Sequence, residues 1–264
     1  MGLIEKDICF HLRVTSEQVG KYVIMPGDPG RVPKIAEYLE NAQQMACNRE
    51  YNTYTGTLLG EKVSVVSTGI GGPSAAIAME ELIRCGAHTF IRIGTSGGID
   101  IKVSGGDLIV ASGAVRGDGT SKEYIPEDYP AVPDFDVLCA LKDSAEALST
   151  EEIGNRYHVG VIQSKDSFYG EIEPEKMPVA EYLKNRWEAY VRCGCLTSEM
   201  EAATLFSVAI ARHVRAGAVF TALWNVERTK AGLPDTPCES SERAIKCAVG
   251  AIKLLIEGDR KKNV

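Results

Sequence analysis

Short apolar segments alternate with amphipathic helical patterns along this chain, and this alternation limits the folds that it can adopt. The segments that predict strands are residues 22–25, 62–67, 89–93, 107–112, 157–162 and 216–224. Apolar residues at helical spacing predict helices within residues 32–39, 74–85, 199–213 and 236–257. Because strands that alternate with helices bury both faces of one sheet, we expect a layered α/β domain with a mostly parallel or mixed sheet. No linker divides residues 1–264, which we expect to form a single domain.

The charge of the chain and its cysteine pattern argue against several classes of function. The formal net charge is −7 and the isoelectric point is near 5.3, which disfavours a nucleic acid or an anionic membrane as the main partner. No apolar stretch is long enough to span a bilayer, so we expect a soluble cytoplasmic protein. The eight cysteines include no repeated CxxC and no Cys/His cluster, so they predict neither a zinc site nor a disulfide framework.

The stretch VIMPGDPGR, residues 23–31, joins a predicted strand to a predicted helix through a rigid and charged corner. Gly27 and Gly30 let a ligand approach the backbone closely, and free N–H groups at a helix start favour an anion. Arg31 adds a planar cation that is suited to phosphate. These residues predict a phosphate site, but an ordinary tight turn with Arg31 in water explains the same pattern.

A second glycine-rich corner, STGIGGPS at residues 67–74, lacks the third glycine and the acidic residue of a dinucleotide-binding fingerprint, so a Rossmann cofactor site is not favoured. In the strand that follows, IRIGTSGGI, Arg92 interrupts apolar residues and shares a face with Phe90 and Gly94. A guanidinium buried there needs a negatively charged partner, unless the strand lies at a sheet edge and Arg92 reaches water. Thr95 and the residues after it suit a phosphate or a sugar at the end of this strand.

Two further motifs each admit a structural and a functional interpretation. In TSEMEAATLF, Ser198 and Glu201 have the spacing of a capping box. Alternatively, Glu201 accepts hydrogen bonds from two sugar hydroxyls while Met200 covers the ribose ring. In DSFYG, Phe168 and Tyr169 lie beside a glycine and suit stacking on a base, although aromatic pairs are more often part of a core.

Six motifs occur in the order found in the nucleoside phosphorylase family, and the chain resembles this family over nearly its whole length. The motifs are MPGDPGR, NREYNTYTG, STGIGGPSAAIAMEEL, IRIGTSGGI, DSFYG and SEMEAATL, and they are most similar to those of members that cleave uridine. The resemblance implies a three-layer αβα sandwich around a mixed, partly barrel-like β-sheet. It also implies a pentosyltransferase in which phosphate attacks the anomeric carbon through an oxocarbenium-like state and releases uracil and ribose 1-phosphate. Inorganic phosphate is then the co-substrate, and no organic cofactor is needed.

The resemblance also implies which residues form the site, each by its match to a family motif. Phosphate would be held by Gly27, Arg31, Arg92 and Thr95, and by Arg49 of a neighbouring subunit. Ribose would be held by Thr95, Met200 and Glu201, and by His11 of a neighbouring subunit. The base would lie near Phe168, Glu199 and Arg228, and the catalytic residues would be Arg92, Thr95, Glu201 and Arg228. A monovalent cation such as K⁺ would lie between subunits at Glu50, Ile70 and Ser74. The expected assembly is a homo-oligomer, namely a dimer with shared sites that is repeated as a trimer of dimers.

The residues near the predicted base site favour a pyrimidine but depart from the usual pattern. Where purine-specific relatives have a serine-aspartate pair, this chain has Trp224 and Asn225, and Arg228 can hydrogen-bond a pyrimidine carbonyl. Glu171 and Lys176 occupy the places of the glutamine and the arginine that read the uracil edge in uridine-cleaving members. We expect these two side chains to pair at the base edge. The alternative is that both point into water.

Two other functions stay open from the sequence. The first is a purine or broad-specificity nucleoside phosphorylase, and the second is a non-catalytic nucleoside- or phosphate-binding protein on the same fold. A nucleosidase is less favoured, because an enzyme that uses water has no need for Arg31, Arg49 and Arg92 around one anion.

Overall fold

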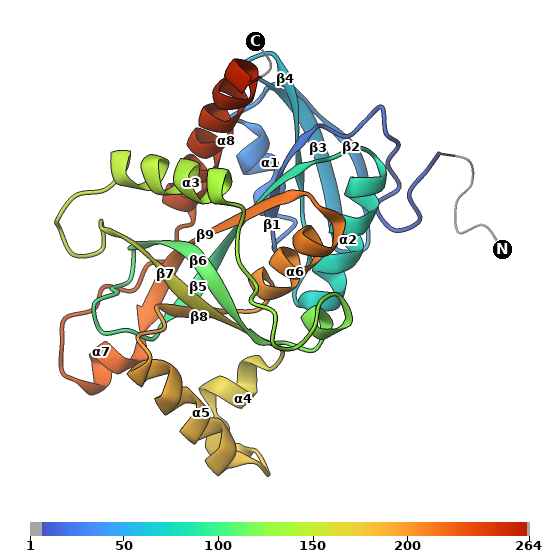
Figure 1. The fold of residues 1–264 in the computed structure, drawn as a ribbon. Coiled ribbons are helices and arrows are strands. Elements are labelled where there is room, and N and C mark those ends of the chain that lie inside the picture. Colours follow the sequence, from blue (N-terminus) through green and yellow to red (C-terminus); the bar gives the residue numbers. More distant parts are fainter. Residues whose placement is uncertain (1–6, 263–264) are drawn as a thin grey trace.

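The computed structural model describes residues 7–262, which form one mixed sheet of nine strands flanked by helices (Figure 1). The strand order in the sheet is β2-β3-β4-β1-β5-β8-β7-β6-β9. The strands are β1 (Tyr22–Pro26), β2 (Glu40–Asn48), β3 (Tyr51–Leu58), β4 (Glu61–Val66), β5 (Thr89–Gly98), β6 (Leu108–Gly117), β7 (Tyr157–Lys165), β8 (Thr197–Glu199) and β9 (Arg215–Asn225). The helices are α1 (Arg31–Ala36), α2 (Gly72–Arg84), α3 (Phe135–Ala147), α4 (Phe168–Ile172), α5 (Ala180–Arg192), α6 (Ala202–Arg212), α7 (Val226–Lys230) and α8 (Glu242–Lys262), with 3₁₀-helices η1 (Thr120–Glu123) and η2 (Pro174–Lys176).

Five strands of the sheet close into a barrel-like ring. Strand β5 pairs with β8 and also with β9, so the order β5-β8-β7-β6-β9 returns to its start. The pairing is parallel between β5 and β9 but antiparallel between β5 and β8. The expected α/β fold with a mixed, partly barrel-like sheet is therefore confirmed. Because β5 also pairs with β1, it lies inside the sheet, and Arg92 is not on an edge strand.

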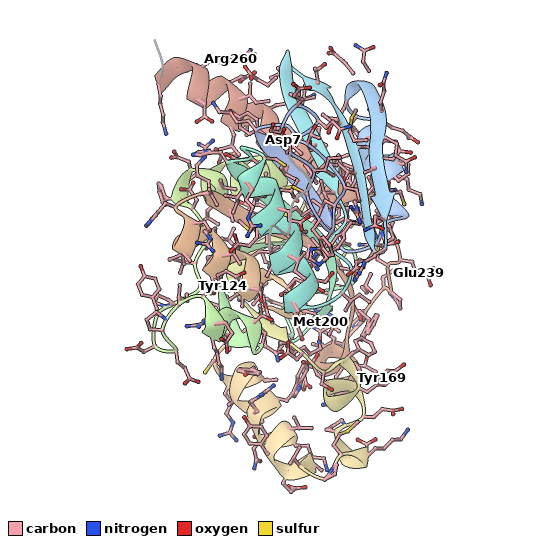
Figure 2. The ribbon with its side chains drawn as sticks, turned by 90° about the vertical axis from the view of Figure 1, so that its right-hand side faces the viewer. Asp7, Tyr124, Tyr169, Met200, Glu239 and Arg260 are labelled. Atoms are coloured by element: carbon pink, nitrogen blue, oxygen red, sulfur yellow. The ribbon has the colours of Figure 1, made fainter. Side chains whose placement is uncertain are left out.

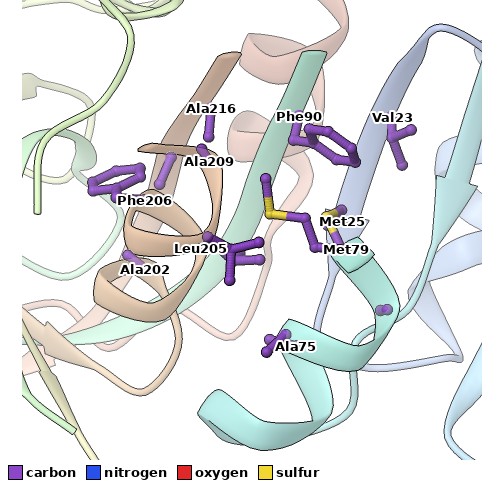
Figure 3. Packing of buried hydrophobic residues seen from close by; sticks show 14 of the residues in the cluster. Val23, Met25, Ala75, Met79, Phe90, Ala202, Leu205, Phe206, Ala209 and Ala216 are labelled. Carbon is purple, nitrogen blue, oxygen red and sulfur yellow. The ribbon is translucent and has the colours of Figure 1, made fainter. Parts of the chain in front are cut away.

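Helices cover both faces of the sheet (Figure 1). Ile91 of β5 and Ile252 of α8 belong to the buried apolar cluster on the face that α3 and α8 cover. Phe90, the neighbour of Ile91, belongs to the opposite cluster with Met79 of α2 and Leu205 of α6 (Figure 3). Successive strand residues point to opposite faces, so one strand supplies both clusters. The two clusters hold β5 from both sides and thereby fix the position of Arg92.

The last helix begins and ends later than the sequence pattern predicts. Helix α8 begins at Glu242 and continues past Gly258. Residues 236–241 are not helical. In this segment the N–H of Cys238 donates to the carbonyl of Leu223 in β9, which ties the segment to the end of that strand. A capping pattern is local, whereas this contact depends on β9 lying beside the segment.

Several elements carry no strong signal in the sequence. Strands β2 and β3 form an antiparallel hairpin, and β2 has no fully buried residue and begins with a mainly polar sequence. Strand β8 is three residues long. Helix α5 buries no residue completely in this chain. None of the helices within residues 7–262 is both long enough and apolar enough to cross a membrane.

Candidate active site

A cavity of about 1610 Å³ opens at the carboxyl ends of β1, β6, β7 and β9, beside β5 and β8. Ligands of α/β sheets bind at such strand ends. Helices α4 and α5 project from the rest of the fold and line the outer part of this cavity (Figure 1). Figure 2 shows Tyr169 on α4 and Met200 on the connection between β8 and α6. The predicted site residues that line the cavity are Gly27, Arg31, Glu50, Ile70, Arg92, Thr95, Phe168, Glu171, Glu199, Met200 and Glu201.

The glycine corner after β1 and the end of β5 form one wall of the cavity. Arg92 is only 5% exposed, and its Nη1 has no hydrogen-bond partner among the described residues. A Cβ atom built on Gly27 would lie 3.8 Å from this Nη1, so glycine keeps the backbone close to the guanidinium without a side chain between them. Burial, together with the positive charge of Arg92, lowers the pKa of Arg31 despite the opposing effect of Asp28. The unused Nη1 donor of Arg92 beside a second cation suits a small anion at this wall.

Two buried carboxylates hold Arg92 from the other side. Its Nε lies 3.2 Å from Oε2 of Glu199, and its Nη2 pairs with Oε2 of Glu201. Burial raises the pKa of the Glu201 carboxyl, an effect that Arg92 opposes and Glu199 reinforces. Oε1 of Glu201 accepts a 2.6 Å hydrogen bond from the N–H of Gly71. The sequence predicts a counter-charge for Arg92, and these carboxylates supply it.

The capping-box interpretation of Ser198 and Glu201 is wrong. Ser198 belongs to β8, and Glu201 makes no side-chain capping bond at the start of α6. Glu199 caps the start of α6 instead, because its Oε1 accepts a 2.9 Å hydrogen bond from the N–H of Ala202. Glu201 and Met200 both line the cavity, and the ribose contact that the functional interpretation assigns to them stays a prediction.

The outer end of the cavity contains an ion pair that the sequence reasoning missed. Lys165, the last residue of β7, places its Nζ 2.7 Å from Oε1 of Glu171 and 2.5 Å from Oγ of Ser198. The Ser198 hydroxyl donates to the other oxygen of Glu171 at 2.9 Å. Phe168 is 43% exposed, and its ring centroid lies 5.9 Å from the Lys165 ammonium. The signal in the sequence that could have indicated this ion pair is a lysine directly before the DSFYG motif.

The expected pair of Glu171 and Lys176 is not formed among the described residues. Lys176 instead pairs with Glu173 at 2.8 Å, and its side chain is 63% exposed and does not line the cavity. Lys176 is the last residue of the short 3₁₀-helix η2, and its partner Glu173 lies three residues earlier, at the start of that helix. Glu171 takes Lys165 as its cation, because β7 ends beside α4.

Arg228 lies outside the lining of the cavity. Its Nε and Nη2 donate to the carbonyl of Pro234 at 2.8 and 2.5 Å, and its Nη1 donates to the carbonyl of Ile101 at 2.5 Å. These bonds hold the guanidinium against the loop that contains Pro234 and the loop that contains Ile101. Asn225 caps α7 by accepting from the N–H groups that follow it, while Trp224 lines the cavity.

The two residues expected to act in a neighbouring subunit also lie outside this cavity. Nδ1 of His11 is 2.7 Å from Oε1 of Glu81, and His11 lines a separate cavity of about 470 Å³. Arg49 is exposed and has a positive φ of 55°. Neither residue contributes to the cavity of its own chain.

Two of the residues expected to hold a monovalent cation, Glu50 and Ile70, line the same cavity as the Gly27 corner. Oγ of Ser74 donates to Oε1 of Glu50 at 2.8 Å, and Ile70 is 78% exposed. Hydrogen bonds from backbone and from Ser74 lower the pKa of Glu50, which favours the ionised carboxylate. Carboxylate, hydroxyl and carbonyl oxygens are the ligands that hard cations take, so these residues fit such an ion.

Comparisons with known proteins show the family of the chain. A family model described as Phosphorylase superfamily matches residues 21–254. The chain is 48% identical over 260 residues to a uridine phosphorylase of Treponema pallidum (strain Nichols), with 98% of this chain and 99% of that protein covered. It is 42% identical to a uridine phosphorylase of Thermococcus kodakarensis, with coverages of 98% and 90%. It is also 41% identical to a guanosine phosphorylase of Halorubrum lacusprofundi, with coverages of 93% and 98%.

Proposed function

This chain belongs to the phosphorylase superfamily, and from this premise we propose that it cleaves the N-glycosidic bond of uridine with phosphate. The products are uracil and ribose 1-phosphate, and the enzyme is a pentosyltransferase. The observation that carries the proposal is the unpartnered Nη1 of Arg92, which is buried next to Arg31 and Gly27. A buried donor normally has a partner, and a small oxyanion such as phosphate supplies one for both arginines.

The residues around the cavity perform the reaction mainly by positioning. Arg92, Arg31, Thr95 and the backbone at Gly27 hold phosphate, while Glu201 accepts hydrogen bonds from ribose hydroxyls. A phosphate oxygen forms a bond to C1′ as the C1′–N bond breaks, and the electron pair of that bond goes to the base. Donors near the base stabilise the negative charge that builds on it, and the released base takes a proton from water.

The assembly and the ions are proposed from the same family membership. A dimer would bring His11 and Arg49 of one subunit into the site of the other, and three dimers would form a hexamer. Glu50, Ile70 and Ser74 would hold a K⁺ ion between subunits. The enzyme needs no organic cofactor, and we place it in the cytoplasm, where nucleosides and inorganic phosphate occur together.

A purine or broad-specificity phosphorylase is the second candidate. The 41% identity to a guanosine phosphorylase favours it, because base preference differs between relatives of similar identity to this chain.

Uridine should be cleaved only when phosphate is present. The expected result is stoichiometric release of uracil and ribose 1-phosphate, measured by chromatography with and without phosphate, because the site is built for an anionic nucleophile. Parallel reactions with thymidine, deoxyuridine, cytidine, inosine and adenosine measure base preference. Equal release of uracil in both conditions would instead identify a nucleosidase. Binding of uridine without any turnover would identify a binding protein.

A further inference from the structure

Lys165 is a buried cation that the reaction described above does not use. The residue is 5% exposed, and its ion pair with Glu171 is closed into a triangle by the Ser198 hydroxyl. Burying an ion pair has a desolvation cost that its mutual attraction seldom exceeds, so apolar residues would serve stability as well. All three residues line the same cavity as Arg92. The triangle therefore has a position suited to a ligand.

The hydrogen-bond inventory of the triangle leaves defined groups unused. An ammonium has three donors, and two of those of Lys165 go to Glu171 and Ser198. The third has no hydrogen-bond partner among the described residues. Each oxygen of Glu171 accepts one hydrogen bond and has a lone pair left. The triangle thus offers a ligand one positively charged donor beside a negatively charged acceptor.

A second observation on the same strand also indicates a polar ligand. Gln163 is two residues before Lys165 in β7, so its side chain lies on the same face of the strand. It is 1% exposed and lines the cavity, and its Oε1 has no partner among the described residues. Buried polar atoms are nearly always hydrogen-bonded, so an unpartnered one beside an ion pair indicates that a bound group completes the network.

We propose that Lys165 and Glu171 together select a base that presents a ring carbonyl beside a ring N–H. Lys165 donates to the carbonyl oxygen, Glu171 accepts from the N–H, and the exposed ring of Phe168 supports the face of the base. Uracil, thymine, hypoxanthine and guanine all present this carbonyl and N–H edge. Cytosine and adenine present an amino group beside a bare ring nitrogen. The Lys165 donor would then face the amino donor, and the Glu171 acceptor would face the ring nitrogen, which is also an acceptor. The inference rests on the proposed function, because it concerns the leaving group of that reaction.

The same contact contributes to the reaction itself. When the C1′–N bond breaks, the negative charge on the departing base is shared with its carbonyl oxygens. The ammonium of Lys165 then faces an oxygen that is more negative in the transition state than in bound nucleoside, so its stabilisation increases as the reaction proceeds. Lys165 is accordingly a catalytic residue as well as a determinant of specificity.

The test compares kcat/KM for uridine, cytidine, inosine and adenosine in the wild type and in Lys165→Met. The wild type should favour uridine over cytidine, and inosine over adenosine, each by about 10⁴-fold. In Lys165→Met, kcat/KM for uridine and inosine should fall by about 10²- to 10³-fold, because a donor to a developing charge is lost. The values for cytidine and adenosine should not fall, and KM for phosphate should stay unchanged. Lys142→Met, the same change on the exposed face of α3, is the matched control and should behave as wild type.

A folded Lys165→Met enzyme that keeps both wild-type preference ratios would overturn the proposal. If that variant does not fold because Glu171 is left without its cation, the double variant Lys165→Met with Glu171→Gln removes both charges together. The neutral amide at position 171 can present either its oxygen or its N–H group to the base. The preferences for uridine over cytidine and for inosine over adenosine should therefore both be lost, and wild-type preferences would again contradict the proposal.

Failure of the proposed function gives a different result. A wild type that cleaves no nucleoside in phosphate refutes the phosphorylase assignment only. Calorimetric binding of uridine and cytidine, in which N1 of the base carries the ribose, to the wild type and to Lys165→Met then tests the base edge without turnover. Uridine should bind more tightly than cytidine to the wild type, and Lys165→Met should lose this preference; the same preference in both proteins would overturn the role of Lys165.

Discussion

Replacing Arg92 with alanine should lower kcat/KM for phosphate by about 10²- to 10³-fold, the usual loss when one preorganised donor to a reacting anion is removed. The expectation follows from its Nη1, which is buried and has no hydrogen-bond partner within residues 7–262. The variant also leaves Glu199 and Glu201 buried together without a cation, which costs about 3–5 kcal/mol of folding free energy. Rates should therefore be measured well below the thermal midpoint of the variant.

Arg212→Ala is the matched control for this experiment. Arg212 is 50% exposed, pairs with Glu80 and does not line the cavity, so its removal should leave the rate and KM for phosphate unchanged. Steady-state kinetics at varied phosphate compare the three proteins, and a thermal melt confirms that each is folded. An Arg92→Ala enzyme with the wild-type rate and the wild-type dependence on phosphate would place Arg92 outside the phosphate site.

Mixing two inactive variants should restore activity if subunits share their sites. His11→Ala removes a residue supplied to the neighbour, and Glu201→Ala removes a residue that a subunit keeps for itself. In a mixed dimer the site that contains Glu201 of one chain and His11 of the other is native, whereas the second site lacks both. Random pairing of equal amounts should therefore recover roughly a quarter of the wild-type activity.

The mixing experiment needs proof that mixed assemblies exist. The two variants carry different affinity tags, are unfolded and refolded together, and are purified over both tags in sequence. Each variant refolded alone is the control and should stay inactive. Doubly purified assemblies without activity would show that His11 does not serve a neighbouring site, and the cavity would then have to work with residues of one chain.

The sequence alone was sufficient for the parts of the site that depend on short segments. The corner from Gly27 to Arg31 joins β1 to α1 as expected, because glycine, proline and helical spacing act within a few residues. Arg92 was expected to need a counter-charge, because a charge within an apolar strand is rarely buried alone. The order of six motifs indicated the family, which the comparisons then established.

The tertiary structure decided which charged groups meet. Arg92 pairs with Glu199, 107 residues later in the chain, and no local pattern specifies such a contact. Lys165 and Lys176 are equally plausible cations for Glu171 in the sequence, but the end of β7 brings only Lys165 to it. The predicted capping box and the predicted pair of Glu171 and Lys176 were wrong for a related reason. A side chain bonds the nearest suitable partner once strands and loops are in place, and a local sequence pattern does not specify that partner.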